Sequence, residues 1–197
     1  AFMVDLGADV RFKNLNCKWS SSRADNVVFD RLKVRVRPEV VSFGREYQPS
    51  SASGPRIAPG AWNAFIDSPQ VTVIDTRNKY ETEIGGFPNA IPANIVSFRD
   101  FPKFVERELD PSTDSKLALY CTGGIRCEKA FQFLTEQGFD QVYQLDGGIL
   151  NYLAEVDDAD NLWSGECFVF DQRVALDSNL RQGTYDQCHA CRRPISA

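Results

Sequence analysis

The sequence predicts an α/β protein in which a parallel sheet is covered by helices on both faces. Apolar runs typical of strands alternate with segments of helical character between residues 57 and 156, and such alternation favours parallel strands joined by helical crossovers. A second observation is that Cys121 directly follows one of the apolar runs and precedes two glycines. Ligands bind beyond the carboxyl ends of parallel strands, so this fold places Cys121 where chemistry is expected.

The expected elements follow one another in a regular order. They are a helix at Trp62–Asp67, a strand at Val71–Asp75, a helix at Phe101–Glu108, a strand at Leu117–Cys121, a helix at Glu128–Gln137, a strand at Val142–Leu145 and a helix at Ile149–Glu155. The helix that follows Cys121 is expected to end at Gly138, because glycine is common just past the last helical residue.

The regions on either side of this domain differ from it in composition. Two strand-like segments near the N-terminus, Arg11–Lys18 and Leu32–Val41, leave no room for a separate core, and Pro49–Pro55 has the composition of a linker. Since the chain starts at Ala1 and not at a methionine, we expect it to be a fragment. The expected divisions are a truncated N-terminal remnant at 1–44, a linker at 45–56, the central domain at 57–156 and an irregular C-terminal extension at 157–197.

Composition is that of a soluble globular protein. The chain has 197 residues, 43% hydrophobic and 25% charged, which is enough to bury a sizeable core. No apolar run approaches the roughly 20 residues that span a membrane, and no signal peptide is recognisable. Six cysteines without regular spacing do not predict a disulfide framework. We therefore expect a cytoplasmic protein with reduced thiols and no membrane association.

The segment from Cys121 to Cys127 predicts an anion-binding loop around a reactive thiol. Backbone N–H groups converge in such a turn, and the N-terminus of the next helix adds positive potential. With the guanidinium of Arg126, these groups favour a thiolate at Cys121, which we expect to be ionised and reachable at the rim of a pocket. The loop amides are expected to come from Thr122, Gly123, Gly124 and Ile125. The alternative, a small apolar residue that ends a core strand, leaves the glycines and the arginine without a purpose.

The spacing of Cys121 and Arg126, C-x4-R, limits what the loop can hold. The loop of a cysteine phosphatase, which encloses a tetrahedral phosphate, is one residue longer. A shorter loop fits a single sulfur or one reacting atom better. Cys127 either resolves an oxidised or persulfidated Cys121 as a disulfide, if the Cβ atoms approach to about 4 Å, or is a small packing residue; both interpretations stay open.

Three further groups of residues are candidates with weaker signals. Asp75 and Arg77 follow a strand and are expected to support neighbouring loops more than to react. Cys188 and Cys191 have the C-x2-C spacing of half a zinc site, and since zinc needs four ligands we expect reduced, unoccupied thiols here. A basic segment alternates with apolar residues, so its cations would share one strand face about 6.6 Å apart. These possible phosphate contacts, which could equally be a solvated strand face, are Arg31, Lys33, Arg35 and Arg37.

Several motifs resemble the rhodanese domain and, beyond it, one family that contains such a domain. The rhodanese-like motifs are Val71–Arg77 followed by Tyr80, Glu81, Gly85 and Gly86, then Cys121–Arg126, then Leu145–Leu150. The motifs of the narrower family are Arg31–Arg37 with Glu39, Asp75–Asn78, Phe98–Pro102, Cys121–Ala130, Gly165–Asp171 and Tyr185–Cys191. Together they resemble the bacterial tRNA wobble-uridine hydroxylases (TrhO, also called YceA), over residues from about Phe12 to Ser196.

This resemblance implies both a fold and an activity. The fold is a rhodanese-like parallel sheet, preceded by the remnant of a ferredoxin-like α+β domain. The activity is the oxygen-dependent 5-hydroxylation of the wobble uridine of tRNA, with Cys121 as the reactive thiol, tRNA as the partner and no obligate protein partner. Molecular oxygen is the implied co-substrate; no flavin, haem or iron motif is recognisable, and zinc is expected only in a full-length protein.

Two other function classes stay open. The loop taken alone favours a sulfurtransferase that carries a persulfide on Cys121. A binding module without activity is disfavoured because Cys121 is present. Net charge is −5 at pH 7, so overall electrostatics do not indicate nucleic-acid binding.

Overall fold

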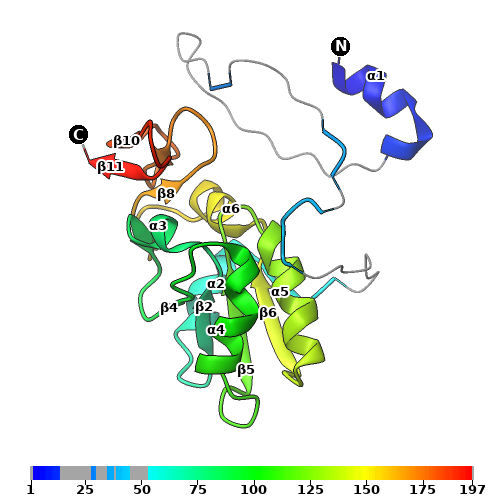
Figure 1. The fold of residues 1–197 in the computed structure, drawn as a ribbon, viewed down its shortest axis with the longest axis vertical. Coiled ribbons are helices and arrows are strands. Elements are labelled where there is room, and N and C mark those ends of the chain that lie inside the picture. The colour runs from blue at the N-terminus through cyan, green and yellow to red at the C-terminus, as the bar shows by residue number, and fades with distance from the viewer. Residues whose placement is uncertain (1, 14–27, 30–34, 38, 45–52, 197) are drawn as a thin grey trace.

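The computed structural model describes residues 2–13, 28–29, 35–37, 39–44 and 53–196 (Figure 1). Its centre is a five-stranded sheet in the order β1-β6-β5-β2-β4, in which every neighbouring pair is parallel. The strands are β1 (Arg56–Ile57), β2 (Thr72–Asp75), β4 (Ile91–Pro92), β5 (Lys116–Tyr120) and β6 (Gln141–Leu145). The prediction of a parallel α/β sheet is therefore confirmed.

Helices cover both faces of this sheet, and β5 shows how its sequence decides which face each side chain meets. Leu117 and Leu119 pack with one cluster of apolar residues and Ala118 and Tyr120 with another, because successive side chains of a strand point to opposite faces. The first cluster contains side chains from α4 (Phe101–Glu108) and α5 (Ile125–Glu136), and the second contains side chains from α2 (Pro59–Ile66) and α6 (Gly148–Glu155). Within the described ranges, no helix is both long and apolar enough to cross a membrane.

The C-terminal extension contains short strands and is not irregular throughout. Its pairs are antiparallel: β3 (Gly85–Gly86) with β7 (Ser164–Gly165), β8 (Cys167–Phe168) with β9 (Ala175–Leu176), and β10 (Tyr185–Gln187) with β11 (Pro194–Ser196). The β3–β7 pair joins the extension to the central domain at two glycines, and a Cβ on Gly85 would lie 2.5 Å from the carbonyl oxygen of Glu166. Pairs of two or three residues between distant segments leave no periodic pattern in the sequence, so composition did not indicate them.

The predicted N-terminal strands are wrong where the structure describes them. A helix, α1 (Phe2–Ala8), is followed by the 3-10 helix η1 (Val10–Phe12), whose first turn is capped by Asp9 accepting from the Arg11 N–H. Residues 35–37 and 39–41 form no strand, because no described strand lies beside them to complete the hydrogen bonds that a strand requires. Residues 14–18, 32–34 and 38 of the two predicted strands lie outside the described residues.

Residues 39–44 instead pack against the helices that carry the Cys121 loop. The ring of Phe43, 1% exposed, lies 5.1 Å from the ring of Phe98 and 5.6 Å from that of Phe133 in α5. Phe98 belongs to the 3-10 helix η2 (Phe98–Asp100). The ammonium of Lys129 in α5 binds the Glu39 carboxylate and the Val41 carbonyl oxygen, so its charge is paired with residues of this N-terminal segment.

The start of α6 lies directly against the backbone of the Cys121 loop. The N–H of Ile149 donates to the carbonyl oxygen of Cys121 at 3.0 Å. Gly148 has φ +70°, and a Cβ there would lie 2.4 Å from the same oxygen and 2.7 Å from the Gly124 nitrogen. Only glycine allows both this backbone conformation and this close approach.

We predict that Gly148→Ala lowers the free energy of unfolding by about 1–3 kcal/mol, because the added Cβ meets backbone in a strained conformation. Urea denaturation followed by circular dichroism measures the change. The matched control is Gly60→Ala in α2, where an added Cβ meets nothing within 4 Å and should stabilise the fold by up to about 1 kcal/mol. Equal effects of the two substitutions would contradict the close approach at α6.

Candidate active site around Cys121

The loop after β5 wraps its own backbone around the sulfur of Cys121. Gly124, with φ +85°, turns the chain so that α5 begins at Ile125, three residues before the predicted start at Glu128. The Gly124 N–H donates to Cys121 Sγ at 3.1 Å, and the backbone N–H groups of Cys127 and Arg126 also lower the pKa of Cys121. The predicted convergence of amides on the thiol is present, although two of these donors belong to the first turn of α5.

The surroundings of Cys121 favour its thiolate. The hydrogen bond from the Cys127 thiol is the main cause that lowers the pKa of Cys121 to about 5; burial opposes it, and the charge of Arg126 and the loop amides add to it. Burial, followed by the neighbouring Cys121 sulfur, raises the pKa of Cys127 well above its usual value. The pair therefore holds its proton on Cys127 and its negative charge on Cys121.

A third buried thiol shows what burial does without these donors. Cys167, 0% exposed in the apolar cluster beside α6, has its pKa raised to about 12, mainly by burial. Cys121 is buried to a similar degree, with 2% of its surface exposed, yet its pKa moves in the opposite direction. Hydrogen bonds and the Arg126 charge thus outweigh desolvation at Cys121.

The expectation that Cys121 is reachable at an open rim is wrong for this conformation. Only 2% of the surface of Cys121 is exposed, so little of its side chain meets solvent. A reactant therefore reaches the thiolate only when the loop or a neighbouring segment moves. The low pKa of Cys121 determines the pH at which it becomes reactive, and its burial limits how fast it then reacts.

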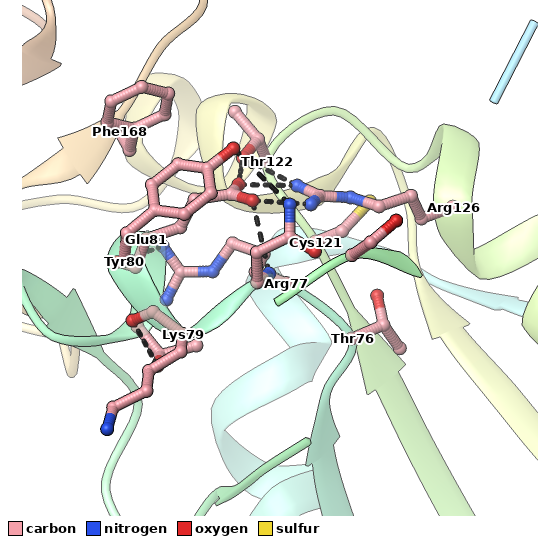
Figure 2. A network of polar contacts seen from close by, with 12 residues as sticks. Thr76, Arg77, Lys79, Tyr80, Glu81, Cys121, Thr122, Arg126 and Phe168 are labelled. Carbon is pink, nitrogen blue, oxygen red and sulfur yellow. Dashed lines mark hydrogen bonds and ion pairs between the residues drawn. The ribbon is translucent and has the colours of Figure 1, made fainter. Parts of the chain in front are cut away.

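Arg126 does not project its guanidinium freely into the loop. Its two terminal nitrogens each lie 2.6 Å from a different carboxylate oxygen of Glu81, and one of them donates to the Thr122 hydroxyl at 3.3 Å (Figure 2). The side chains of Arg126 and Glu81 are 8% and 0% exposed. Arg126 thus acts on the thiolate through its charge and clamps the loop to α3 (Lys79–Thr82).

Glu81 is the residue of this site to which our sequence analysis assigned no role. One carboxylate oxygen accepts from the backbone N–H of Asn78 at 3.1 Å, as in a capping box at the start of α3. The spacing Asn78-x-x-Glu81 was a readable signal for that cap. The second task of Glu81, holding Arg126 from 45 residues away in sequence, had no local signal.

Asp75 and Arg77 form a second buried ion pair, which contacts the backbone of Glu81 (Figure 2 shows Arg77). The Arg77 guanidinium binds the Asp75 carboxylate at 2.6 Å and donates to the carbonyl oxygens of Glu81 and Gly85 at 3.1 and 2.6 Å. It also lies 5.0 Å from the ring of Trp163. These contacts connect the end of β2 to α3 and β3, which is the arrangement a supporting role requires.

The basic segment is only partly described. Arg35 and Arg37 are exposed and lie outside any strand, so the predicted ladder on one strand face is wrong for this pair. Arg31 and Lys33 lie outside the described residues.

Glu128, at the start of α5, binds Arg56 of β1 at 2.6 Å.

The cysteine pair near the C-terminus lies at a hairpin turn. Cys188 and Cys191 fall between β10 and β11, where the Cys188 N–H donates to the Arg193 carbonyl oxygen at 2.9 Å. Backbone N–H groups of Cys191 and Ala190 lower the pKa of Cys188. In the part of the chain that the structure describes, no group of three or more His, Cys, Asp or Glu side chains is placed to hold a metal.

Comparison with known proteins identifies the family of the central domain. Residues 59–155 match the family described as Rhodanese-like domain. The chain contains a rhodanese-like domain. Its sheet, with Cys121 at the carboxyl end of β5, is the framework on which the loop is built.

Solved structures that resemble the chain include other rhodanese-like domains. One from Anabaena sp. is 20% identical, covers 56% of this chain and 79% of its own, and has a TM-score of 0.46. A rhodanese-like domain protein from Staphylococcus aureus is 22% identical, covers 50% of this chain and 90% of its own, and has a TM-score of 0.42. A thiosulfate sulfurtransferase from Pseudomonas aeruginosa is 19% identical, covers 56% of this chain and 20% of its own, and also has a TM-score of 0.42. The rhodanese-like domain is compatible with sulfur transfer or with another reaction of a cysteine.

We predict that Cys127→Ala shifts the alkylation profile of Cys121 to higher pH. The substitution removes the donor that contributes most to lowering the Cys121 pKa, so the thiolate forms at higher pH and the midpoint rises. Iodoacetamide labelling as a function of pH, followed by peptide mass spectrometry, measures it. In the unsubstituted protein the midpoint should lie well below the usual thiol value of about 8.5, while the plateau rate should be slow because the sulfur is buried. Cys191→Ser, at an exposed thiol, is the control that should leave the midpoint unchanged.

We predict that Glu81→Gln lowers the free energy of unfolding by about 3–5 kcal/mol, because it leaves the buried Arg126 guanidinium without a counter-charge. Thermal and urea denaturation measure the loss. Adding Arg126→Met should restore part of it, since no unpaired charge then remains. The control is Glu83→Gln at the exposed pair with Lys79, which should change stability by less than about 1 kcal/mol. A loss of that small size for Glu81→Gln would contradict the clamp.

Proposed function

We propose that this protein hydroxylates the wobble uridine of tRNA at C5, with dioxygen as co-substrate and the Cys121 thiolate as nucleophile. The observation that carries the proposal is a stabilised thiolate in a short loop, next to a segment absent from the rhodanese-like domain itself. That segment, Gly165–Asp171, is one of the motifs that resemble the tRNA hydroxylases. It pairs with β3 through Gly165 and places the Phe170 ring 5.9 Å from the Arg126 guanidinium carbon.

The chemistry follows from what a thiolate does to uracil. C5 of uracil is a weak nucleophile until an anion adds at C6, when the ring becomes an enolate with electron density on C5. The Cys121 thiolate is such an anion at neutral pH, since its pKa is lowered to about 5. The loop N–H groups and the charge of Arg126 stabilise the negative charge of the Cys121 sulfur before it adds to C6 and after it leaves C6.

The oxygen atoms and electrons balance if both loop cysteines take part. The enolate C5 attacks dioxygen, the C5 proton is lost, and the thiolate leaves C6, which gives a 5-hydroperoxyuracil. The Cys121 thiolate then attacks the outer peroxide oxygen, which leaves the 5-hydroxyl on the base and a sulfenic acid on Cys121. The Cys127 thiol displaces water from that sulfenic acid to form a disulfide, and an external thiol reduces the disulfide.

RNA contacts in this proposal come from the basic segment before the domain. Arg35 and Arg37 are exposed and can neutralise phosphates, with Arg31 and Lys33 as further members of the segment. The overall charge of −5 means that such contacts are local and not a property of the whole surface.

A second candidate function is sulfur transfer by a persulfide on Cys121. The six-residue loop favours it because a short loop suits a small group such as one additional sulfur atom, and the loop amides stabilise negative charge at the sulfur. Incubation with thiosulfate followed by intact-mass spectrometry would reveal an added sulfur atom, and a thiosulfate-to-cyanide assay would measure its transfer.

We predict that Cys121→Ser abolishes 5-hydroxyuridine formation, because a serine hydroxyl does not ionise at neutral pH. The measurement is mass spectrometry of digested tRNA from cells that lack the gene and carry either variant. Cys191→Ser, at the exposed C-terminal pair, is the control that should retain the product. Normal amounts of 5-hydroxyuridine with Cys121→Ser would rule out the thiol route.

A further inference from the structure

An aromatic side chain is displayed next to the loop and is not used by the mechanism above. Phe170 is 65% exposed, and its ring lies 5.9 Å from the guanidinium carbon of Arg126, the residue clamped into the loop by Glu81. Single exposed apolar residues are ordinary on protein surfaces. Phe170 differs from them because its neighbour is the buried cation that acts on the Cys121 thiolate.

The turn that carries Phe170 is held rigidly. Val169 donates its N–H to the Val174 carbonyl oxygen at 2.8 Å, and Val174 donates to the Asp171 carbonyl oxygen at 3.1 Å. Arg173 binds the Asp171 carboxylate through two nitrogens at 2.6 and 3.0 Å, and both side chains are less than 10% exposed. Val174 has φ +64°, a conformation that a β-branched residue adopts only where its surroundings impose it.

The Phe170 ring also packs against the buried Phe168, which in turn meets the partly buried Tyr80. Phe170 meets Phe168 edge to face at a centroid distance of 5.2 Å, and Phe168, 2% exposed, meets Tyr80 in the same way at 5.2 Å (Figure 2 shows Phe168 and Tyr80). Tyr80 precedes Glu81 in α3. The aromatic series therefore ties Phe170 to the helix that clamps Arg126, and the ring and the loop share one support.

We propose that Phe170 is the platform on which one face of the target pyrimidine stacks while its other face is open to the Cys121 loop. This proposal rests on the proposed function and names the occupant of the surface: an unpaired nucleobase of single-stranded RNA. Such bases are recognised by stacking on exposed aromatic rings, and Phe170 provides one beside the residue whose charge acts on the thiolate. Stacking covers one face of the pyrimidine and leaves the other face free, and a thiolate adds to C6 from such a free face.

Ile125 offers a second apolar contact on the loop itself. It is the first residue of α5 and is 57% exposed, although it lies between two residues of the reactive segment. Between Phe170 and Cys121, a base would pass the loop that contains Ile125. Phe170 is accordingly a binding residue for the base, and Cys121 remains the reacting one.

The test is base-dependent RNA binding by the whole chain. The probes are an anticodon stem-loop RNA with uridine at the wobble position and the same RNA with an abasic residue there, titrated by fluorescence anisotropy. Stacking of one base on an aromatic side chain corresponds to about a 5- to 150-fold difference in affinity. We expect the unsubstituted protein to prefer the uridine RNA by that factor, Phe170→Ala to lose the preference, and Phe170→Trp to retain it.

The control is Leu162→Ala, which removes an apolar side chain that is 40% exposed near the end of α6 and should leave the preference unchanged. The proposal is overturned if the unsubstituted protein does not distinguish the two RNAs, or if Phe170→Ala still does. Mass spectrometry of the product separates this test from the proposed function. Base-dependent binding through Phe170 without 5-hydroxyuridine would overturn hydroxylation alone, and hydroxylation unchanged by Phe170→Ala would overturn stacking alone.

Discussion

The ion pair between Glu81 and Arg126 is the interaction on which the rest of the site depends. It joins a short helix after β2 to the first turn of α5, and both side chains are almost completely buried. Burying a charge pair is stabilising only when geometry and additional hydrogen bonds compensate for lost hydration, and here Asn78 and Thr122 provide those hydrogen bonds. Because Arg126 is held in this way, its charge acts on the Cys121 sulfur from a constant direction without being a ligand-binding group.

The two loop cysteines show that charge in this site is decided by hydrogen bonds more than by burial. Cys121 and Cys127 are both buried, but only Cys121 receives the converging N–H groups. The proton therefore stays on Cys127, so Cys121 is the more nucleophilic of the two sulfurs and Cys127 is its hydrogen-bond donor. The same asymmetry suits peroxide reduction and persulfide transfer, so it supports a cysteine-based reaction without distinguishing between those two.

The C-terminal extension is an integral part of this site. It pairs with β3 at two glycines, contributes Trp163 next to the buried Arg77 and places Phe170 beside Arg126. Its fixed turn and strained Val174 would have no evident purpose in a plain connecting segment. With this addition the rhodanese-like domain has an exposed aromatic ring, Phe170, beside Arg126, and the proposed binding of a nucleobase rests on that ring.

The sequence alone determined the parallel sheet, the order of its main elements and the loop at Cys121, because these depend on local periodicity and on glycines at turns. The spacing of Asn78 and Glu81 also contained a signal for the cap of α3, although no cap was predicted from it. Only the tertiary structure decided what Arg126 contacts, that Cys121 is covered, and that residues 35–41 lack a strand where described. Each of these depends on partners far away in the chain: a carboxylate, a packing surface or a neighbouring strand. The local sequence pattern does not indicate such distant partners, so only the folded structure identifies them.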